Sequence, residues 1–187
     1  AGDAGLSVCC SGYTGEDGFE ISVPQDAAVA LARQLLAHDA VKPAGLGARD
    51  SLRLEVGYAL YGNDLDEEHT PYESALAWIT KPDAKDFVGR AALVEQKANG
   101  VPTRLTGLRL SARGFPRPGY PVVHQGQEVG VVTSGVLSPS LGEGIALVRV
   151  RADLAAAGTE LAIRIRDREI PGVTQRPSFY TEGSIRR

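Results

Sequence analysis

The chain has 187 residues, of which 43% are hydrophobic and 23% are charged, and its formal net charge is -3. A chain of this length and composition can bury a real core, which excludes intrinsic disorder, collagen and coiled coil. The negative charge argues against nonspecific binding to nucleic acid or an anionic membrane. No apolar run reaches the roughly 20 residues of a spanning helix. We therefore expect neither a nucleic acid nor a membrane as a partner.

Two short strands are predicted at the start of the chain. LSVCCSGY, residues 6–13, is an apolar run, and FEISVP, residues 19–24, alternates with a period of two. Phe19 and Ile21 share one face of the second strand, and Glu20 lies on the opposite face. The stretch between the strands is rich in glycine and acidic residues, which is typical of either a surface turn or a binding loop.

Three helices are predicted in the first hundred residues. The first begins at Pro24 and ends before Pro43. The second begins near Leu46 and breaks around Gly57, where a helix interior is disfavoured. A third, short helix is predicted within a linker at residues 81–102, which is rich in Lys, Asp and Gly.

After Val101 the pattern changes to alternating strands separated by glycine and proline turns. The strand segments are TRLTGLRL, PVVHQGQEVGVVTSG, IALVRVR and ELAIRIRDREI. They predict a small antiparallel sheet or barrel. The fold class is therefore α+β, and we place the domain boundary between residues 1–95 and residues 96–187.

No metal site is predicted. Cys9 and Cys10 are adjacent, a spacing that rarely forms a disulfide, and no CxxC pair follows. We expect them to be buried strand cysteines of a protein in a reducing compartment. His38, His69 and His124 stand in three unrelated contexts, and we expect ordinary surface or loop histidines.

Three glycine-rich motifs are predicted to be turns. GLGARD, residues 45–50, lacks the third glycine and the preceding strand of a dinucleotide fingerprint. GEDGFE, residues 15–20, lacks the twelve-residue ligand spacing of a calcium loop. TSGVLSPSLGEG, residues 133–144, has no Walker lysine, which favours a tight strand connection.

Glu20 and Arg49 are the charged residues most difficult to explain as surface residues. Glu20 lies on a strand between apolar neighbours, and Arg49 begins a helix among small residues from which a long guanidinium can reach inward. A desolvated carboxylate needs a partner. The pattern leaves two alternatives open, a shared buried polar site or two solvated side chains.

Several segments together resemble one family, the T protein of the glycine cleavage system, a folate-dependent aminomethyltransferase. They are GYTGEDGFEISVP, KPAGLGARDSLRLEVGYALYGNDLDEEHTPYESALAWI, DFVGR and GVVTSGVLSPSLGEGIALVRV. The resemblance covers nearly the whole chain but only the C-terminal half or so of a full-length member. Since the chain also contains no methionine, we expect a fragment without the N-terminal half.

The resemblance implies a fold, a reaction and a site. The fold is the second half of the folate-binding α/β region followed by a small antiparallel β-barrel. The reaction transfers a methylene group from the aminomethyl-dihydrolipoyl arm of the H protein to tetrahydrofolate and releases ammonia, without a metal. The site residues implied for folate are Glu20, Arg49 and Trp78. The implied location is the cytoplasm, or the mitochondrion in a eukaryote.

The resemblance implies no catalytic residue here, because the carboxylate that assists attack by folate N5 belongs to the preceding half. The chain also departs from the family pattern: Cys10 and Ser11 stand where Arg-Thr is common, and the tail that carries Tyr180 matches only loosely. Two alternatives remain open. One is a non-catalytic folate-binding or interaction module, and the other is the folate domain of a dimethylglycine or sarcosine demethylating enzyme.

Overall fold

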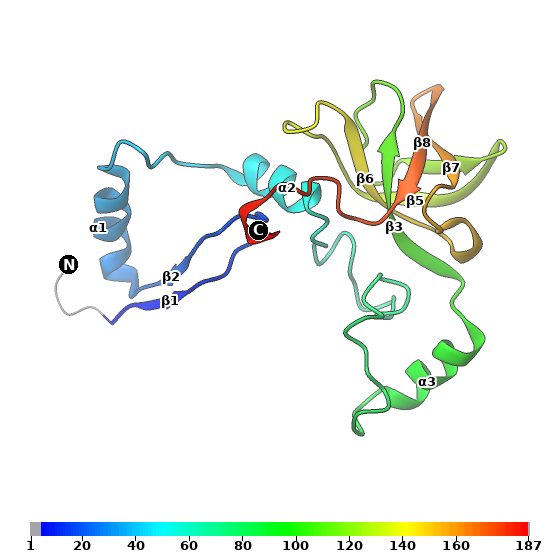
Figure 1. Ribbon diagram of the computed structural model, residues 1–187, viewed down its shortest axis with the longest axis horizontal. Helices are drawn as coiled ribbons and strands as arrows, with labels where there is room; N and C mark the ends of the chain where they lie inside the picture. The colour runs from blue at the N-terminus through cyan, green and yellow to red at the C-terminus, as the bar shows by residue number, and fades with distance from the viewer. Residues whose placement is uncertain (1–4, 187) are drawn as a thin grey trace. The chain divides into compact units, whose positions relative to one another are not determined.

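The computed structural model describes residues 5–186. The chain divides into two compact units: a first unit of Ala1–Arg53 with Thr181–Arg187, and a second unit of Leu54–Tyr180. Within the described residues there are three α-helices and a closed barrel of six antiparallel strands, which confirms the predicted α+β class (Figure 1). None of these helices is long and apolar enough to cross a membrane.

The first unit contains a two-stranded antiparallel sheet and helices. Strand β1 (Ser7–Cys9) pairs with β2 (Glu20–Ser22), and Cys9 stands opposite Glu20. Helix α1 (Gln25–Leu36) follows β2, and α2 (Leu46–Glu55) begins in this unit. The predicted strands and helices are therefore confirmed, with strands shorter than the apolar runs that predicted them.

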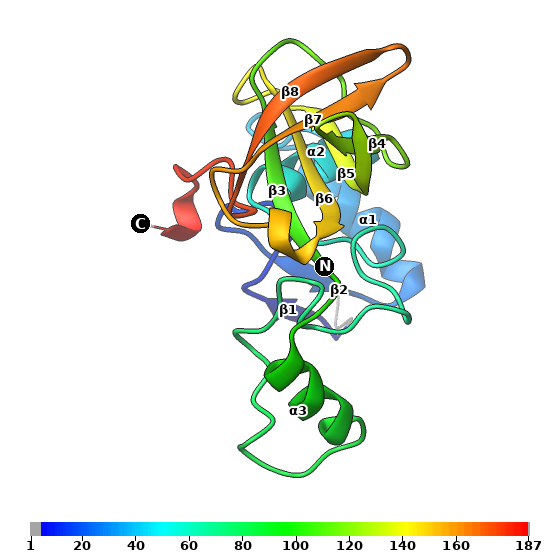
Figure 2. The same cartoon turned by 90° about the vertical axis from the view of Figure 1, so that its right-hand side faces the viewer.

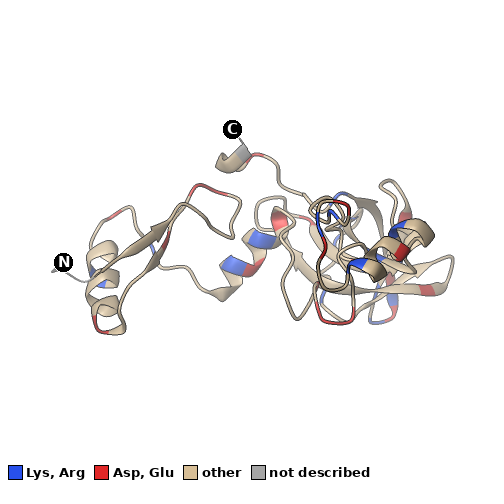
Figure 3. Cartoon of the chain, turned by 90° about the horizontal axis from the view of Figure 1, so that it is seen from below, with Lys and Arg blue, Asp and Glu red and all other residues tan. Residues whose placement is uncertain are grey.

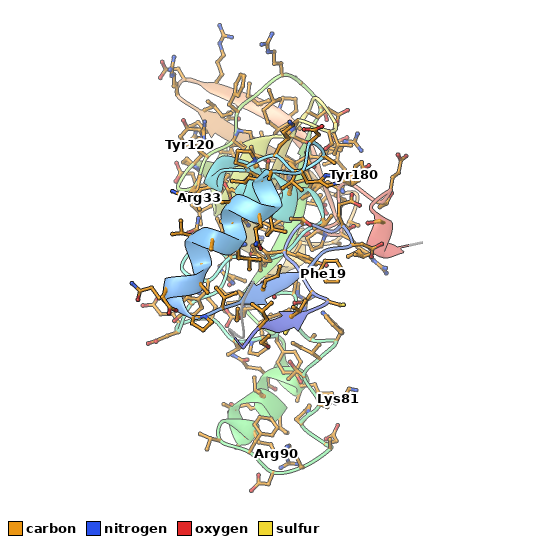
Figure 4. The ribbon with its side chains drawn as sticks, turned by 90° about the vertical axis from the view of Figure 1, so that its left-hand side faces the viewer. Phe19, Arg33, Lys81, Arg90, Tyr120 and Tyr180 are labelled. Carbon is orange, nitrogen blue, oxygen red and sulfur yellow. The ribbon has the colours of Figure 1, made fainter. Side chains whose placement is uncertain are left out.

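Apolar side chains of the first unit are exposed. Every residue of β1 and β2 is exposed, and no described residue of α1 is buried. Figure 4 labels Phe19 at this hairpin, where it is 69% exposed. The other large exposed apolar residues of the unit are Leu6, Val8, Ile21, Val29, Leu35, Leu36, Val41, Leu46 and Ile185. A two-stranded sheet is marginally stable without a covering layer.

The expectation of buried strand cysteines is wrong. Cys9 and Cys10 are both free and exposed. The sequence pattern around them is that of a buried strand, but nothing among the described residues covers either face of the β1–β2 sheet.

We predict that the 187-residue chain self-associates in solution, because an exposed apolar surface of this extent is an aggregation hazard. The measurement is static light scattering at increasing protein concentration. Replacing Val29 and Leu36 on α1 by glutamine should lower the association. Val94→Gln is the matched control, since Val94 is similarly exposed on a helix of the second unit. A monodisperse monomer of the unmodified chain at every concentration would contradict this prediction.

The second unit is built on the barrel, in which the strands follow the order β3-β6-β5-β4-β7-β8 and β8 pairs with β3 to close it (Figure 2). The strands are β3 (Thr103–Leu110), β4 (Pro121–His124), β5 (Gln127–Leu137), β6 (Gly144–Arg151), β7 (Glu160–Ile165) and β8 (Arg168–Gln175). The predicted antiparallel barrel is confirmed. All six pairings are antiparallel, and the three between consecutive strands, β4–β5, β5–β6 and β7–β8, are hairpins.

Strand β6 is buried on both faces. Ala146 and Val148 belong to the core inside the barrel, whereas Ile145 and Leu147 belong to a second cluster with Phe179 and others. Alternate side chains of a strand point to opposite faces. The outer face of β6 is therefore covered by other segments of the second unit, and this explains why every residue of the strand except Arg151 is buried.

Helix α3 (Arg90–Asn99) confirms the short helix predicted within the linker. The Arg90 guanidinium donates a hydrogen bond to the Pro82 carbonyl at 2.6 Å, and Lys97 pairs with Asp83 at 3.0 Å. These contacts fold the segment before the helix back along it. The domain boundary between residues 95 and 96 stays a proposal.

Gly57 ends α2, as predicted. Its φ of +82° is left-handed, and a Cβ at this position would lie 1.1 Å from the Pro177 carbonyl oxygen. Only glycine fits both demands.

Candidate functional site

Glu20 is the first residue of β2, and among residues 5–186 its carboxylate has one hydrogen-bond donor. The Ser11 hydroxyl donates to Glu20 Oε2 at 2.5 Å. Ser11 lies two residues beyond Cys9, the residue opposite Glu20, so it falls diagonally across the hairpin on the same face. The hydroxyl therefore fixes the rotation of an otherwise exposed carboxylate.

Arg49 is contacted by an aromatic ring of the same unit. Its guanidinium carbon lies 4.9 Å from the centroid of the Tyr13 ring, within the range of a cation–π interaction. Figure 3 shows basic and acidic residues alternating along α2. Arg49 is exposed, so Tyr13 orients a guanidinium that solvent still reaches.

The loop of residues 11–19 therefore contacts both predicted residues. Ser11 binds Glu20, and Tyr13 packs against Arg49. Among residues 5–186 no hydrogen bond or ion pair joins Glu20 directly to Arg49, and both side chains are exposed. Of the two alternatives left open by the sequence, the solvated one is the arrangement found here.

Trp78 belongs to the second unit, where it is 76% exposed. It follows the segment that contains Asp64, which is hydrogen-bonded to the barrel strand β5. Tyr180 also belongs to this unit, and its backbone N–H donates to the Glu55 carbonyl at 2.7 Å.

A buried polar network around Asp64 anchors that segment to the barrel. The Asp64 carboxylate accepts hydrogen bonds from the Thr133 hydroxyl at 2.5 Å and from the Ser134 hydroxyl at 2.8 Å. It also accepts the Leu60 N–H at 2.9 Å. Arg149 donates to the Asp64 carbonyl oxygen at 2.8 Å. Sequence reasoning missed these residues, because the contacts of Asp64 with Thr133, Ser134 and Arg149 join positions 69, 70 and 85 apart.

A second polar connection joins the end of α2 to the β5–β6 turn. The Glu55 carboxylate accepts the Ser138 hydroxyl at 2.5 Å and both the hydroxyl and the N–H of Ser140. The serines of TSGVLSPSLGEG, predicted to form a tight strand connection, thus bind a carboxylate of the protein itself. This accounts for their presence without a phosphate ligand.

Two pockets of the second unit lie on the barrel. One, of about 780 Å³, is lined by residues that include Arg109, Glu143 and Arg113. Arg109 and Glu143 form an ion pair, which lowers the pKa of the Glu143 carboxyl below its usual range. The other, of about 630 Å³, includes four arginines: Arg113, Arg117, Arg166 and Arg168. No motif in the sequence indicated these arginines.

The histidines have local roles. The His69 ring nitrogen Nδ1 lies 2.8 Å from the Asp66 carboxylate, and this hydrogen bond lowers the pKa of Asp66. His38 and His124 each contact backbone groups. Within the described part of the chain, no group of three or more His, Cys, Asp or Glu residues could hold a metal ion.

Comparison with known proteins places the two parts of the chain in one family. Residues 2–84 match the family described as "GCVT N-terminal domain", and residues 103–181 match the "Glycine cleavage T-protein C-terminal barrel domain". The match to the second family covers all six barrel strands.

Similar proteins carry one name. An aminomethyltransferase of Synechococcus sp. (strain RCC307) is 52% identical over 171 residues, which are 91% of this chain and 47% of that protein. An aminomethyltransferase of Stenotrophomonas maltophilia (strain K279a) is 49% identical over 95% of this chain and 47% of that protein. The chain thus spans about half the length of the curated relatives it matches.

A solved structure shares the fold. The crystal structure of glycine cleavage system aminomethyltransferase T from Bartonella henselae matches 96% of this chain and 51% of that chain, with a TM-score of 0.90 and 37% sequence identity. The predicted fold, an α+β segment of the T-protein fold followed by a small antiparallel β-barrel, is therefore confirmed. The chain belongs to the glycine cleavage T-protein family, and it corresponds to the C-terminal part of the aminomethyltransferases to which it is similar.

Proposed function

We propose that this chain is part of a folate-dependent aminomethyltransferase of the glycine cleavage system. In the reaction, the bond between the aminomethyl carbon and the sulfur of the dihydrolipoyl arm of the H protein breaks. The carbon forms bonds to two nitrogens of tetrahydrofolate, which lose one proton each; one proton leaves with the ammonia, and the other restores the dihydrolipoyl thiol. The observation that carries the proposal is that Glu20 and Arg49, the residues implied for folate, both contact the loop of residues 11–19.

Glu20 suits recognition of the pterin ring. The amidine-like edge of a pterin presents two parallel N–H donors, and a carboxylate accepts two parallel hydrogen bonds in one plane. Ser11 binds Oε2 from the protein side. Each carboxylate oxygen has two lone pairs, so the carboxylate can hold the serine and the pterin edge together.

Arg49 and Trp78 are the other residues that the family resemblance implies for folate. A guanidinium can grip a carbonyl or carboxylate oxygen of folate through two donors, and the Tyr13 ring holds Arg49 in place for this. Trp78 would offer apolar surface or stacking, the role that a large exposed ring commonly has in ligand binding.

We assign no catalytic residue to the chain, and the lipoylated H protein is the proposed partner. The test mixes the chain with lipoylated H protein, tetrahydrofolate and an aminomethyl donor, and measures ammonia. The full-length gene product that carries these residues should release ammonia only when all three are present. The 187-residue chain alone should not. A full-length gene product that releases no ammonia would reject the function.

The alternatives predict different assay results. A non-catalytic folate module would bind tetrahydrofolate without releasing ammonia, and a demethylating enzyme would require a flavin and dimethylglycine or sarcosine. The relatives described above are named aminomethyltransferase, which supports the first proposal.

Ser11→Ala in the full-length gene product should weaken tetrahydrofolate binding roughly threefold to tenfold, the size of one net hydrogen bond. The reason is that the Glu20 carboxylate loses the donor that fixes its rotation. Isothermal titration calorimetry measures the change. Ser11→Thr keeps a hydroxyl and should bind nearly as the unmodified protein does; equal affinity of the alanine and unmodified proteins would argue against this contact.

A further inference from the structure

The C-terminal tail of the chain packs against the loop that leads to Glu20. Ser184, in the short 3-10 helix η2 (Ser184–Arg186), accepts the Asp17 N–H at 2.7 Å. Its hydroxyl donates to Glu16 Oε2 at 2.6 Å, and its N–H donates to the same oxygen at 2.7 Å. In Figure 1 the red C-terminal end lies beside the blue loop between β1 and β2. Three hydrogen bonds thus join segments 167 and 168 residues apart.

Gly183 allows this close approach. It is buried, and a Cβ at this position would lie 2.3 Å from the Gly15 carbonyl oxygen, a distance that real Cβ atoms do not reach. Gly15 is itself buried with a φ of +78°, a conformation that favours glycine. The backbones of the tail and the loop therefore meet without side chains between them.

These contacts fix the loop at a second point. Its beginning and end are joined by the Ser11 to Glu20 hydrogen bond, and its middle is joined to the tail by Glu16, Asp17 and Ser184. A loop with one anchor keeps much of its conformational freedom, and ordering it on ligand binding costs free energy. A loop with two anchors has already lost part of that freedom.

We propose that Ser184 and Gly183 are positioning residues for the folate site, holding the loop of residues 11–19 in the conformation that presents Glu20 to tetrahydrofolate. This inference rests on the proposed function. Neither residue touches the ligand in this account. Their effect passes through Glu16 and Asp17 to the loop and then to the Glu20 carboxylate.

The test uses the full-length gene product with Ser184→Ala, Ser184→Thr and Gly183→Ala. Ser184→Ala removes two of the three hydrogen bonds, and Gly183→Ala forces the tail away from Gly15. Each should raise the KM and the Kd for tetrahydrofolate roughly threefold to tenfold and leave kcat at saturating folate unchanged. Ser184→Thr retains the hydroxyl and should restore binding to within about twofold of the unmodified protein. Ser111→Ala, an exposed serine of the second unit, is the control.

A second measurement reports on the loop without any ligand. Limited proteolysis with a glutamate-specific endopeptidase should cut after Glu16 faster in Ser184→Ala and Gly183→Ala than in the unmodified protein or in Ser184→Thr. A general loss of folding would raise cleavage at all glutamates, whereas release of the loop raises it at Glu16. Unchanged cleavage at Glu16 in both variants would overturn the proposed tail contact.

The outcomes separate this inference from the function. If the unmodified protein fails to bind tetrahydrofolate, the proposed function fails, and the proteolysis still tests the tail contact. If Glu20→Ala loses binding while Ser184→Ala and Gly183→Ala bind as the unmodified protein does, the function stands and the positioning role is overturned.

Discussion

Glu20→Ala in the full-length gene product is expected to weaken tetrahydrofolate binding by about 2 to 3 kcal/mol, roughly 30- to 150-fold. In the proposed complex two pterin N–H donors lose their carboxylate acceptor where the ligand excludes water, and each unpaired donor keeps its full desolvation cost. Isothermal titration calorimetry at constant pH measures the difference. The Ser11 hydroxyl also loses its acceptor, but it can turn to water because this part of the hairpin is exposed.

Two further variants make this result specific. Glu20→Gln keeps the shape of the side chain but replaces one acceptor oxygen by a donor, so it should bind with an affinity near that of the alanine variant. Glu95→Ala removes an exposed carboxylate from α3 and should leave binding unchanged. If Glu20→Ala and Glu95→Ala bind tetrahydrofolate equally well, Glu20 does not contact the pterin.

Asp64→Ala is expected to lower the free energy of unfolding of the second unit by about 2 to 4 kcal/mol. The fully buried carboxylate accepts the Thr133 and Ser134 hydroxyls and the Leu60 N–H, and the substitution leaves buried donors without their acceptor. Asp64 also partly offsets the charge of Arg149, whose pKa is lowered by burial. Urea denaturation followed by circular dichroism measures the change.

Two other aspartate substitutions serve as controls. Asp64→Asn keeps one acceptor oxygen and should cost less than the alanine substitution. Asp167→Ala, at an exposed position between β7 and β8, should change the free energy of unfolding by no more than about 0.5 kcal/mol. Equal stability of Asp64→Ala and Asp167→Ala would show that the Asp64 network does not anchor its segment to the barrel.

Most of the barrel strands could be predicted from the sequence, because alternation and turn residues are features of residues that are close along the chain. TRLTGLRL became β3, and ELAIRIRDREI became β7 and the start of β8, which continues five residues beyond the predicted segment to Gln175. IALVRVR became β6, which is buried on both faces. Its β-branched residues still indicated a strand. Closure into a barrel depends on β8 pairing with β3, which no local pattern specifies.

The exposure of the first unit could not be predicted from local patterns. Cys9, Phe19 and Ile21 have the residue types and the alternation of a covered strand. A period of two tells which face a side chain takes but not whether another layer lies on that face. The buried cysteines that we expected are therefore exposed, and Glu20 and Arg49 are exposed with them.

The folate residues came from family resemblance, whereas their supporting contacts came only from the structure. Nothing in the sequence near Glu16 indicates Ser184, and nothing near Asp64 indicates Thr133, because each pair is distant along the chain. The Tyr13 contact with Arg49 joins a loop to a helix in the same way. Local periodicity carries no information about such pairs.

The most direct test is a crystal structure of the full-length gene product with tetrahydrofolate bound. Our account predicts that both Glu20 carboxylate oxygens lie about 2.7 to 3.2 Å from two neighbouring pterin nitrogens, with the Arg49 guanidinium on the same ligand molecule. A pterin bound elsewhere, with the Glu20 side chain directed into water, would contradict it.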